Sequence, residues 1–375
     1  MPCPNPDVCG SCRWSHIPYE KQLKQKLSDI NGSFALKELD LACETIIPSP
    51  KTDHYRNRMD FVIDFEGRVG MREKGKWWRV IDHHTCFLAD EKIEALFSHV
   101  RAWAQTCGLS FFDRKAHTGF LRYAVIRSTS TGETLINIIT STPETACFKY
   151  DTIVSNLKHL AELAKPTTLL WTTNETISDV SFGDNETVIA GPGYLTESIN
   201  GVAYRISPQA FFQTNLYAAP LLQETVIGLV NEGAKTVLDL YCGSGFFSLP
   251  IATKVEHVTG IELNEAAIED AKRNADLNNL TNTEFFAAKT ESLKLTNYPA
   301  DTIIVDPPRS GMHDHALASL IETKAKQIIY VPCNYKNLAR ELVQLTQHYE
   351  VPDLIAIDMF PHTPHVEVVC NLLLK

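Results

Sequence analysis

The sequence predicts an α/β fold, in which a doubly wound and mainly parallel sheet follows an α+β region. Residues 201–375 alternate short apolar runs with amphipathic helical patterns, which is typical of βαβ units and a parallel sheet. Residues 31–200 instead contain long stretches of alternating apolar and polar residues, which favour an antiparallel sheet. A chain of 375 residues, 44% of them hydrophobic, is long enough for each part to have its own core.

The α+β region is expected to contain three stretches of strand and two helices. Strand-like alternation covers residues 58–73, 120–129 and 134–141, and helical spacing covers 90–106 and 151–164. We place the boundary between the two parts near residue 200. The predicted organisation is therefore an N-terminal segment 1–30, a central α+β domain 31–200 and a C-terminal domain 201–375.

The C-terminal domain is expected to begin with the strand "KTVLDLYCG", which ends in a glycine turn. The strand "HVTGIEL" follows, then a helix over 264–279, and then the strands "DTIIVDPP" and "KQIIYVPC". In the tail 354–375, two apolar runs are joined by a short loop rich in Pro and His. We expect this tail to add a hairpin to the sheet.

Composition and charge exclude several classes of protein. The first 30 residues lack the apolar core of a signal peptide, and no apolar run approaches the length that spans a bilayer, so we expect a cytoplasmic protein without a membrane partner. The formal charge of −10 does not indicate a nucleic-acid-binding protein, although residues 54–80 contain seven Lys or Arg against four Asp or Glu. Nothing in the sequence predicts an obligate protein partner.

Polar and reactive side chains end three successive strands of the predicted parallel sheet. They are Glu262, Asp306 and Cys333, and ligands bind at the carboxyl edge of such sheets. The first strand ends in a turn with Gly243 and Gly245, and an acidic residue after the next strand can bind ribose hydroxyls. Ser248 occupies the place of the third glycine of a pyrophosphate-binding turn, so the pattern favours an adenosyl cofactor without a pyrophosphate.

The ordered motifs "SPQAFFQTN", "DLYCGSG", "GIEL", "DPPR", "VPCN" and "HVEVV" resemble those of the S-adenosylmethionine-dependent RNA uracil-C5 methyltransferases of the RumA/RumB/TrmA group. The resemblance covers essentially the whole chain and implies a Rossmann-like class I methyltransferase domain. The N-terminal "CPNPDVCGSC" resembles the iron-sulfur segment of the ribosomal RNA enzymes of this group. Because the chain starts at this segment, with no room for a preceding β-barrel, the RumB type that methylates 23S rRNA is the expected match.

The resemblance also implies roles for individual residues. Cys333 matches the nucleophile and Glu367 the general base, with His362 and His365 as weaker candidates for the base. Residues expected to contact the cofactor or the flipped uracil are Gln213, Tyr241, Glu262 and Asp306 for S-adenosylmethionine, and Phe211 and Asp306 for the base. Phe246 departs from the family, where an Asn follows the glycine-rich turn.

Cys333 is expected to add to C6 of uracil, which makes C5 nucleophilic enough to take the methyl group. We expect the start of the helix after Cys333 to favour its thiolate. Aromatic stacking by Phe211 or Phe212 would hold the flipped base. The rival interpretations are a cytosine-C5 methyltransferase acting on RNA or DNA, a tRNA uracil-C5 methyltransferase, and an iron-sulfur RNA-binding module without catalysis.

Four cysteines are expected to form a metal centre. Cys3, Cys9 and Cys12 have C-x5-C-x2-C spacing, and Cys86 matches the fourth ligand in the family. From the residues alone, zinc is the stronger prediction, with Cys86, His83 or His84 completing the site. The resemblance favours a [4Fe-4S] cluster with a structural role, which ties the N-terminus to the basic stretch 56–80.

Overall fold

The computed structural model describes residue 3 and residues 8–82 and 86–375, and these form two compact units. The central unit comprises the described residues of 1–16 together with 52–197 and 206–209. The C-terminal unit comprises 17–51, 198–205 and 210–375. Residues 17–51 therefore differ from the sequence-based division, because a strand of this segment pairs in the C-terminal sheet and its helix belongs to the same unit.

The C-terminal unit is built on an eight-stranded sheet in the order β1-β16-β17-β15-β14-β11-β12-β13. Its strands are β1 (Thr45–Ile47), β11 (Thr236–Leu240), β12 (His257–Glu262), β13 (Thr283–Ala287), β14 (Thr302–Val305), β15 (Gln327–Tyr330), β16 (Tyr349–Ile357) and β17 (Glu367–Leu374). Only β17 runs antiparallel to its neighbours, β15 and β16. The predicted doubly wound, mainly parallel sheet with a terminal hairpin is confirmed.

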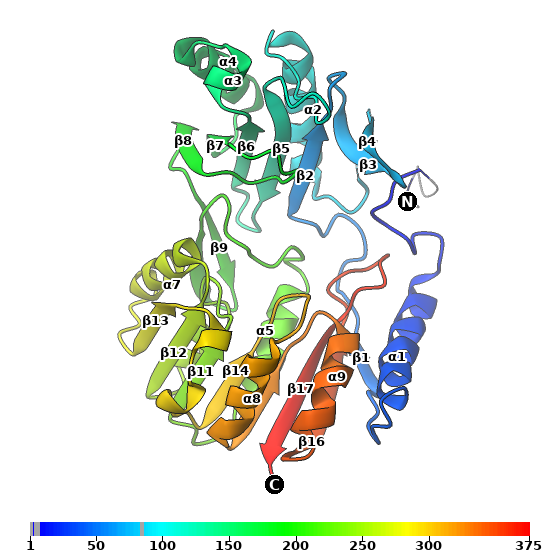
Figure 1. Ribbon diagram of the computed structural model, residues 1–375, viewed down its shortest axis with the longest axis vertical. Coiled ribbons are helices and arrows are strands. Elements are labelled where there is room, and N and C mark those ends of the chain that lie inside the picture. The colour runs from blue at the N-terminus through cyan, green and yellow to red at the C-terminus, as the bar shows by residue number, and fades with distance from the viewer. Residues whose placement is uncertain (1–2, 4–7, 83–85) are drawn as a thin grey trace. The chain divides into compact units, whose positions relative to one another are not determined.

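Helices cover both faces of this sheet (Figure 1), where α8 and α9 lie in front of the strands and α5 lies behind them. The helices are α1 (Tyr19–Ala35), α5 (Ala219–Leu229), α6 (Ser248–Ala252), α7 (Glu265–Leu277), α8 (Asp314–Thr323) and α9 (Tyr335–Leu345), with 3-10 turns at Thr290–Ser292 and Leu295–Asn297. The strands are short and almost continuously buried, as expected for a sheet covered on both faces.

The central unit contains a seven-stranded sheet in the order β4-β3-β2-β5-β6-β7-β8. Its strands are β2 (Arg58–Ile63), β3 (Val69–Glu73), β4 (Lys76–Ile81), β5 (Leu121–Ser128), β6 (Thr134–Thr140), β7 (Thr168–Thr173) and β8 (Asn185–Ala190). The pairing is antiparallel except between β6 and β7. This exception arises because the helix α4 (Tyr150–Ala164) crosses between the two strands.

Two further helices of the central unit are α2 (Glu91–Thr106) and α3 (Pro143–Ala146). The side chain of Asp90 caps α2 by accepting a hydrogen bond from the Lys92 N–H, and the apolar face of α2 enters the core with Phe97 against Phe61. A hairpin of β9 (Leu195–Ile199) and β10 (Val202–Ile206) follows the sheet. Among the residues that the structure describes, no helix combines the length and apolar composition needed to cross a membrane.

Candidate active site

The segments that follow β11, β12, β14 and β15 meet at the carboxyl edge of the C-terminal sheet. Backbone hydrogen bonds fix them side by side, with the Asp306 N–H donating to Leu240 O at 3.3 Å and the Cys242 N–H donating to Ile261 O at 3.1 Å. The Val368 N–H donates to Pro332 O at 3.3 Å, which brings Glu367 beside Cys333. Residues far apart in sequence therefore converge at one edge of the sheet.

The glycine-rich turn after β11 has a left-handed backbone at three positions. Tyr241, Gly243 and Gly245 have φ values of +63°, +54° and +89°. The Gly243 N–H donates to Glu262 Oε2 at 3.3 Å, and the Asn264 N–H donates to Glu262 Oε1 at 2.9 Å. The carboxylate of Glu262 thus lies against the turn and holds it in place.

Ser248, which stands where a pyrophosphate-binding turn has its third glycine, forms a buried hydrogen bond. Ser248 Oγ donates to Asp239 Oδ2 at 2.5 Å inside the core. Burial raises the pKa of Asp239 to about 7, opposed by this hydrogen bond. Sequence reasoning did not single out Asp239, whose only signal was a charged residue inside an apolar strand.

Cys333, Asp306 and Glu367 form one electrostatic group with Arg309. Burial, followed by the charges of Glu367 and Asp306, raises the pKa of Cys333 to about 12, and Arg309 opposes this shift. Burial raises the pKa of Glu367 from 4.5 to about 8, again opposed by Arg309. Burial and the charge of Glu367 also hold the pKa of Asp306 well above its usual range.

The backbone at the helix start does favour the Cys333 thiolate, since a backbone hydrogen bond lowers its pKa, but the net shift of this pKa is upward. The side chain of Asn334 accepts a hydrogen bond from the Lys336 N–H, so the first turn of α9 is already capped by the protein. Burial and two neighbouring carboxyl groups outweigh the backbone hydrogen bond and Arg309, which both lower the pKa of Cys333. Arg309 is the positive group that favours the charged form of Cys333.

The loop that carries Arg309 is held by α9. Asn337 Nδ2 donates to Arg309 O at 2.8 Å, and the Met312 N–H donates to Glu341 Oε1 at 3.1 Å. Glu341 is buried and also accepts a hydrogen bond from the hydroxyl of Tyr330. Sequence reasoning missed Glu341, because a charged residue in an amphipathic helix usually faces solvent.

The two histidines considered as alternative bases have other partners. Arg309 Nη2 lies 2.6 Å from Nδ1 of His365, and Nδ1 of His362 lies 3.0 Å from Gln22 Nε2. Arg309, in contrast to the two histidines, contributes to the pKa shifts of both Cys333 and Glu367. Glu367, 6% exposed, is thus the titratable group that the fold places beside the thiol.

The aromatic pair at 211 and 212 is divided between surface and core. Phe211 is 69% exposed, whereas Phe212 is buried and packs edge-on against Tyr204 and Phe246. Phe246, the residue that departs from the family, is therefore part of an aromatic core. Of this pair, only Phe211 has a solvent-exposed ring.

The remaining residues expected to bind cofactor lie in the same unit. Gln213 is buried and follows the exposed Phe211 by two positions. Tyr241 is half-buried at the glycine-rich turn, and burial raises the pKa of its hydroxyl. The structure thus places Gln213, Tyr241, Glu262 and Asp306 in the unit that carries the parallel sheet.

The four cysteines of the expected metal centre lie together in the central unit, and each is at most 7% exposed. Hydrogen bonding to Cys86, followed by burial and the charges of Cys86, Cys3 and Cys9, raises the pKa of Cys12. Hydrogen bonding to Cys12 lowers the pKa of Cys86. Within residues 3, 8–82 and 86–375, no group of three or more His, Cys, Asp or Glu is arranged to hold a metal ion, so the cluster stays a prediction.

The alternative zinc ligands His83 and His84 lie outside the described residues. The N-terminal segment is nevertheless tied to the hairpin of β3 and β4, since the Lys74 N–H donates to Val8 O at 2.8 Å and Cys9 forms a bridge with Glu73. The N-terminal segment thus contacts the stretch 56–80 through its backbone, and a cluster that ties the two together stays a prediction.

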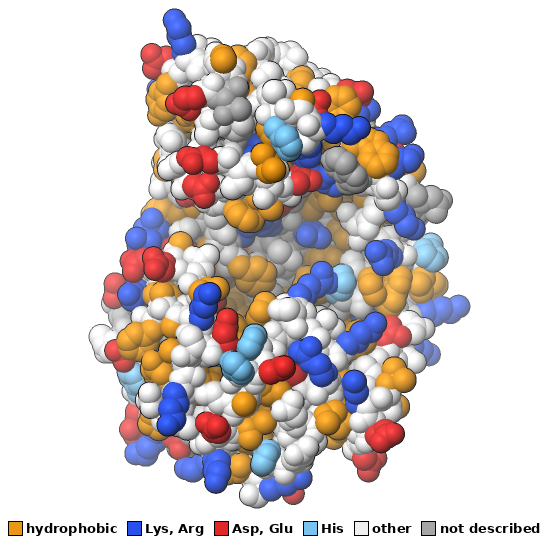
Figure 2. Space-filling view, viewed as in Figure 1, with side chains coloured by type: hydrophobic (Ala, Val, Ile, Leu, Met, Phe, Trp, Pro, Cys, Tyr) orange, Lys and Arg blue, Asp and Glu red, His pale blue; other side chains and the backbone are white. Residues whose placement is uncertain are grey.

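The basic residues of 56–80 are largely paired with acids of the same stretch. The ion pairs are Arg58–Asp60 at 2.9 Å, Arg68–Asp64 at 2.7 Å, Lys76–Glu73 at 2.5 Å and Arg79–Glu73 at 3.0 Å. Figure 2 likewise shows basic and acidic side chains interspersed over the visible surface. The stretch is thus less basic as a surface than its count of Lys and Arg suggests.

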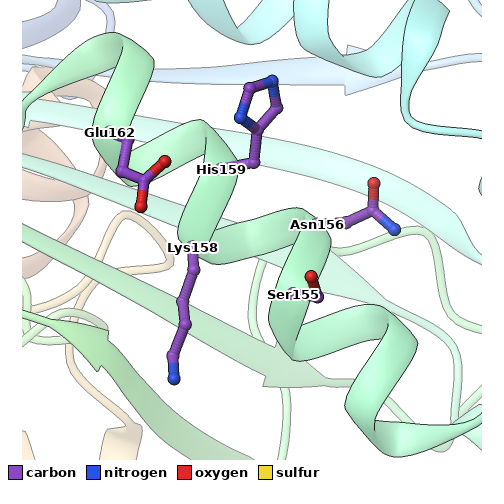
Figure 3. Close-up of a pocket in the computed structure, with 5 residues that line it drawn as sticks. All are labelled: Ser155, Asn156, Lys158, His159 and Glu162. Carbon is purple, nitrogen blue, oxygen red and sulfur yellow. The ribbon is translucent and has the colours of Figure 1, made fainter.

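An open hollow also lies on α4 in the central unit (Figure 3). Its lining residues are Ser155, Asn156, Lys158, His159 and Glu162, all from this one helix. Their side chains point in different directions rather than toward a common point. The hollow contains none of the residues singled out from the sequence.

Comparison with known proteins shows the family to which this chain belongs. A family model described as tRNA (uracil-5-)-methyltransferase matches residues 185–375. An RNA methyltransferase of Caldanaerobacter subterraneus subsp. tengcongensis is 38% identical over 98% of this chain and 83% of its own length. The tRNA (uracil(54)-C(5))-methyltransferase of Pyrococcus horikoshii is 37% identical over 97% of this chain and 84% of its own length.

A solved structure covers almost the whole chain. The Pyrococcus abyssi tRNA (uracil-54, C5)-methyltransferase, in complex with S-adenosyl-L-homocysteine, superimposes with a TM-score of 0.82 at 33% identity, over 96% of this chain and 85% of the other. Together, the fold and the relatives show that this protein is an RNA methyltransferase with the class I methyltransferase fold. The chain belongs to the tRNA (uracil-5-)-methyltransferase family.

The expected match to the RumB type is not supported. Three relatives whose names state a substrate, from Pyrococcus horikoshii, Pyrococcus furiosus and Pyrococcus abyssi, are tRNA uracil-54 enzymes. Of the rival interpretations, the tRNA uracil-C5 methyltransferase fits these relatives best.

Proposed function

We propose that the protein transfers a methyl group from S-adenosylmethionine to C5 of a uridine in tRNA, at the position equivalent to uridine 54. The observation that carries the proposal is the placement of Cys333 beside Glu367 at the carboxyl edge of a class I sheet. The choice of tRNA over 23S rRNA is supported by the names of the relatives that are 36–37% identical to this chain.

Cys333 is the proposed nucleophile. Its sulfur adds to C6 of the flipped uracil, and the electron pair of the C5–C6 bond moves to give an enolate. Arg309 favours the thiolate needed for this step, because its charge lowers the pKa of Cys333. The enolate C5 then takes the methyl group, which S-adenosylmethionine supplies from its sulfonium.

Glu367 is the proposed general base. After methyl transfer, the C5 proton moves to its carboxylate, the C5–C6 double bond re-forms, and the bond between sulfur and C6 breaks. A carboxyl group whose pKa is raised to about 8 is a stronger base once it is ionised, which suits it to removing a proton from carbon.

Asp306 is proposed to contact the uracil through a neutral carboxyl group. Burial and the charge of Glu367 raise its pKa, which favours the protonated form, and a protonated carboxyl group can donate a hydrogen bond to O4 while accepting one from N3–H. Donation to O4 would stabilise the enolate. The exposed ring of Phe211 supplies a stacking surface for a base.

The proposed cofactor contacts come from the turn and the strand ends. Glu262 has a carboxylate at the glycine-rich turn, where a ribose with two hydroxyl groups would find an acceptor. Gln213, Tyr241 and Asp306 complete the proposed set. The bound S-adenosyl-L-homocysteine in the Pyrococcus abyssi relative supports an adenosyl cofactor in this unit.

We also propose that Cys3, Cys9, Cys12 and Cys86 hold a [4Fe-4S] cluster. Their four thiols are buried and near enough to shift the pKa of Cys12, and an all-thiolate set of four suits either this cluster or zinc. The cluster would link the N-terminal segment to the β3–β4 hairpin and take no part in methyl transfer.

Methyl transfer to defined RNAs tests the proposed function. Purified protein is incubated with isotope-labelled S-adenosylmethionine and either a tRNA transcript or fragments of 23S rRNA. One part of the RNA is digested to nucleosides, which identify the modified base, and another part to oligonucleotides, which locate it, and both are analysed by mass spectrometry. We expect labelled 5-methyluridine in the tRNA at a single position, and none with Cys333→Ala. Labelled 5-methyluridine in the rRNA fragments alone would overturn the choice of substrate, and labelled 5-methylcytidine would overturn the reaction.

A further inference from the structure

The helix α1 carries polar side chains on its buried face. Gln22 and Lys26 are completely buried, although both belong to residue types that usually lie at the surface. Both reach the loop 358–366, which connects β16 to β17. This loop leads directly into Glu367, the first residue of β17.

Lys26 binds the start of this loop. Its Nζ lies 2.6 Å from Asp358 Oδ1 and donates to Phe360 O at 3.1 Å, and neither charged side chain has any exposed surface. Asp358 Oδ1 also accepts a hydrogen bond from the Phe360 N–H at 3.1 Å. The ion pair thus fixes the backbone at the point where the chain leaves β16.

Gln22 binds the middle of the same loop. Its Oε1 accepts a hydrogen bond from the His362 N–H at 2.7 Å, and its Nε2 lies 3.0 Å from His362 Nδ1. His362 has a left-handed backbone with φ +66°, which a non-glycine residue adopts only where its surroundings hold it. Gln22 therefore holds the loop at its strained residue.

A buried ion pair contributes little to stability compared with well-packed apolar residues, and in some proteins such pairs serve to fix one particular geometry. Here the geometry that is fixed belongs to a loop without regular secondary structure. The same helix packs against α9, where Ser33 Oγ lies 3.4 Å from Tyr335 O, two residues beyond Cys333.

We propose that Lys26, Asp358 and Gln22 are positioning residues, through which α1 fixes the loop that sets the Glu367 carboxylate against the uracil C5 proton. This inference rests on the proposed function. Cys333 follows a different strand, so loosening the loop affects proton removal more than nucleophilic addition. The covalent complex between Cys333 and RNA then accumulates, because it forms at a normal rate and resolves slowly.

The test compares three variants with wild-type protein. Lys26→Met with Asp358→Asn removes both charges of the pair, Gln22→Leu removes the contact with His362, and Lys24→Met removes an exposed charge from the same helix as a control. For each variant we measure kcat, KM for tRNA, S-adenosylmethionine affinity, and the fraction of RNA in a complex that survives denaturation. Circular dichroism reports the folded fraction.

We expect kcat to fall roughly 10- to 100-fold in the first two variants, as for a displacement of about 1 Å in a reacting group. KM and cofactor affinity should stay near the wild-type values, and the covalent fraction should rise. Lys24→Met should behave as wild type. If either variant kept a normal kcat, or lost kcat only in proportion to its folded fraction without accumulating complex, the positioning role would be refuted.

The Gln22→Leu variant keeps the test decisive if the charge variant does not fold, because it leaves the buried ion pair intact. Failure of the proposed function would look different. In that case wild-type protein and Lys24→Met would also form no 5-methyluridine and no covalent complex.

Discussion

Replacing Glu367 with Gln should stabilise the fold, and by an amount that depends on pH. Burial raises the pKa of Glu367 from 4.5 to about 8. Above pH 4.5 the unfolded chain therefore ionises this group while the folded protein keeps it protonated. A tenfold change in proton affinity corresponds to about 1.4 kcal/mol. The free energy of unfolding of the wild-type protein is thus lowered by an amount that grows from near zero below pH 4.5 to about 5 kcal/mol above pH 8.

Gln has the same shape and no charge, so the variant lacks this penalty. Urea unfolding of wild type and Glu367→Gln at pH 5, 6, 7, 8 and 9 should give a stability difference that rises by about 1.4 kcal/mol per pH unit and levels off above pH 8. Glu350→Gln, at an exposed position of β16, should show no such rise. A difference that is constant with pH, or that falls as pH rises, would refute the buried, protonated state of Glu367.

Three further predictions concern catalysis, cofactor and cluster. In wild-type protein, kcat should rise as pH rises through about 8, because Glu367 must lose its proton before it can act as a base, and a profile that is flat from pH 6 to 9 would contradict this role. Glu262→Ala should weaken S-adenosylmethionine binding by about 1.5–3 kcal/mol in calorimetry, since it removes a charged acceptor and the partner of the Gly243 N–H, whereas the exposed Glu256→Ala should not. Protein purified without oxygen should be brown and contain about four irons per chain, and Cys86→Ser should be colourless. Stoichiometric zinc without iron would contradict the cluster.

The parallel sheet and its reactive edge could be predicted from local sequence. The strands near Asp306 and Cys333 are short apolar runs that end in prolines, and the helix after Glu262 begins at a capping Asn. These signals lie within a few residues of the positions that they define. Because parallel strands share one carboxyl edge, the order of the motifs was enough to bring Glu262, Asp306 and Cys333 together.

Contacts between distant segments could not be predicted in this way. Lys26 and Asp358 are 332 residues apart, and a Lys in an amphipathic helix carries no sign that it will be buried. Residues 17–51 join the C-terminal unit through such contacts, which is why the sequence-based division placed them elsewhere.

The electrostatics of the site also depended on tertiary structure. The start of α9 suggested a thiolate at Cys333. Burial and Glu367, which is distant in sequence but close in space, instead raise the pKa of this thiol. Local dipoles can be inferred from sequence, whereas desolvation and charges from other strands require the fold.

The most direct test of the central claim is to identify the residue that bonds to RNA. Wild-type protein is incubated with S-adenosylmethionine and tRNA containing 5-fluorouridine, in which the fluorine at C5 cannot leave as a proton does, so the covalent complex persists. After digestion with protease and nuclease, mass spectrometry should find a methylated fluorouridine nucleotide attached to Cys333. Attachment to another residue, or a covalent complex that still forms with Cys333→Ala, would contradict the account.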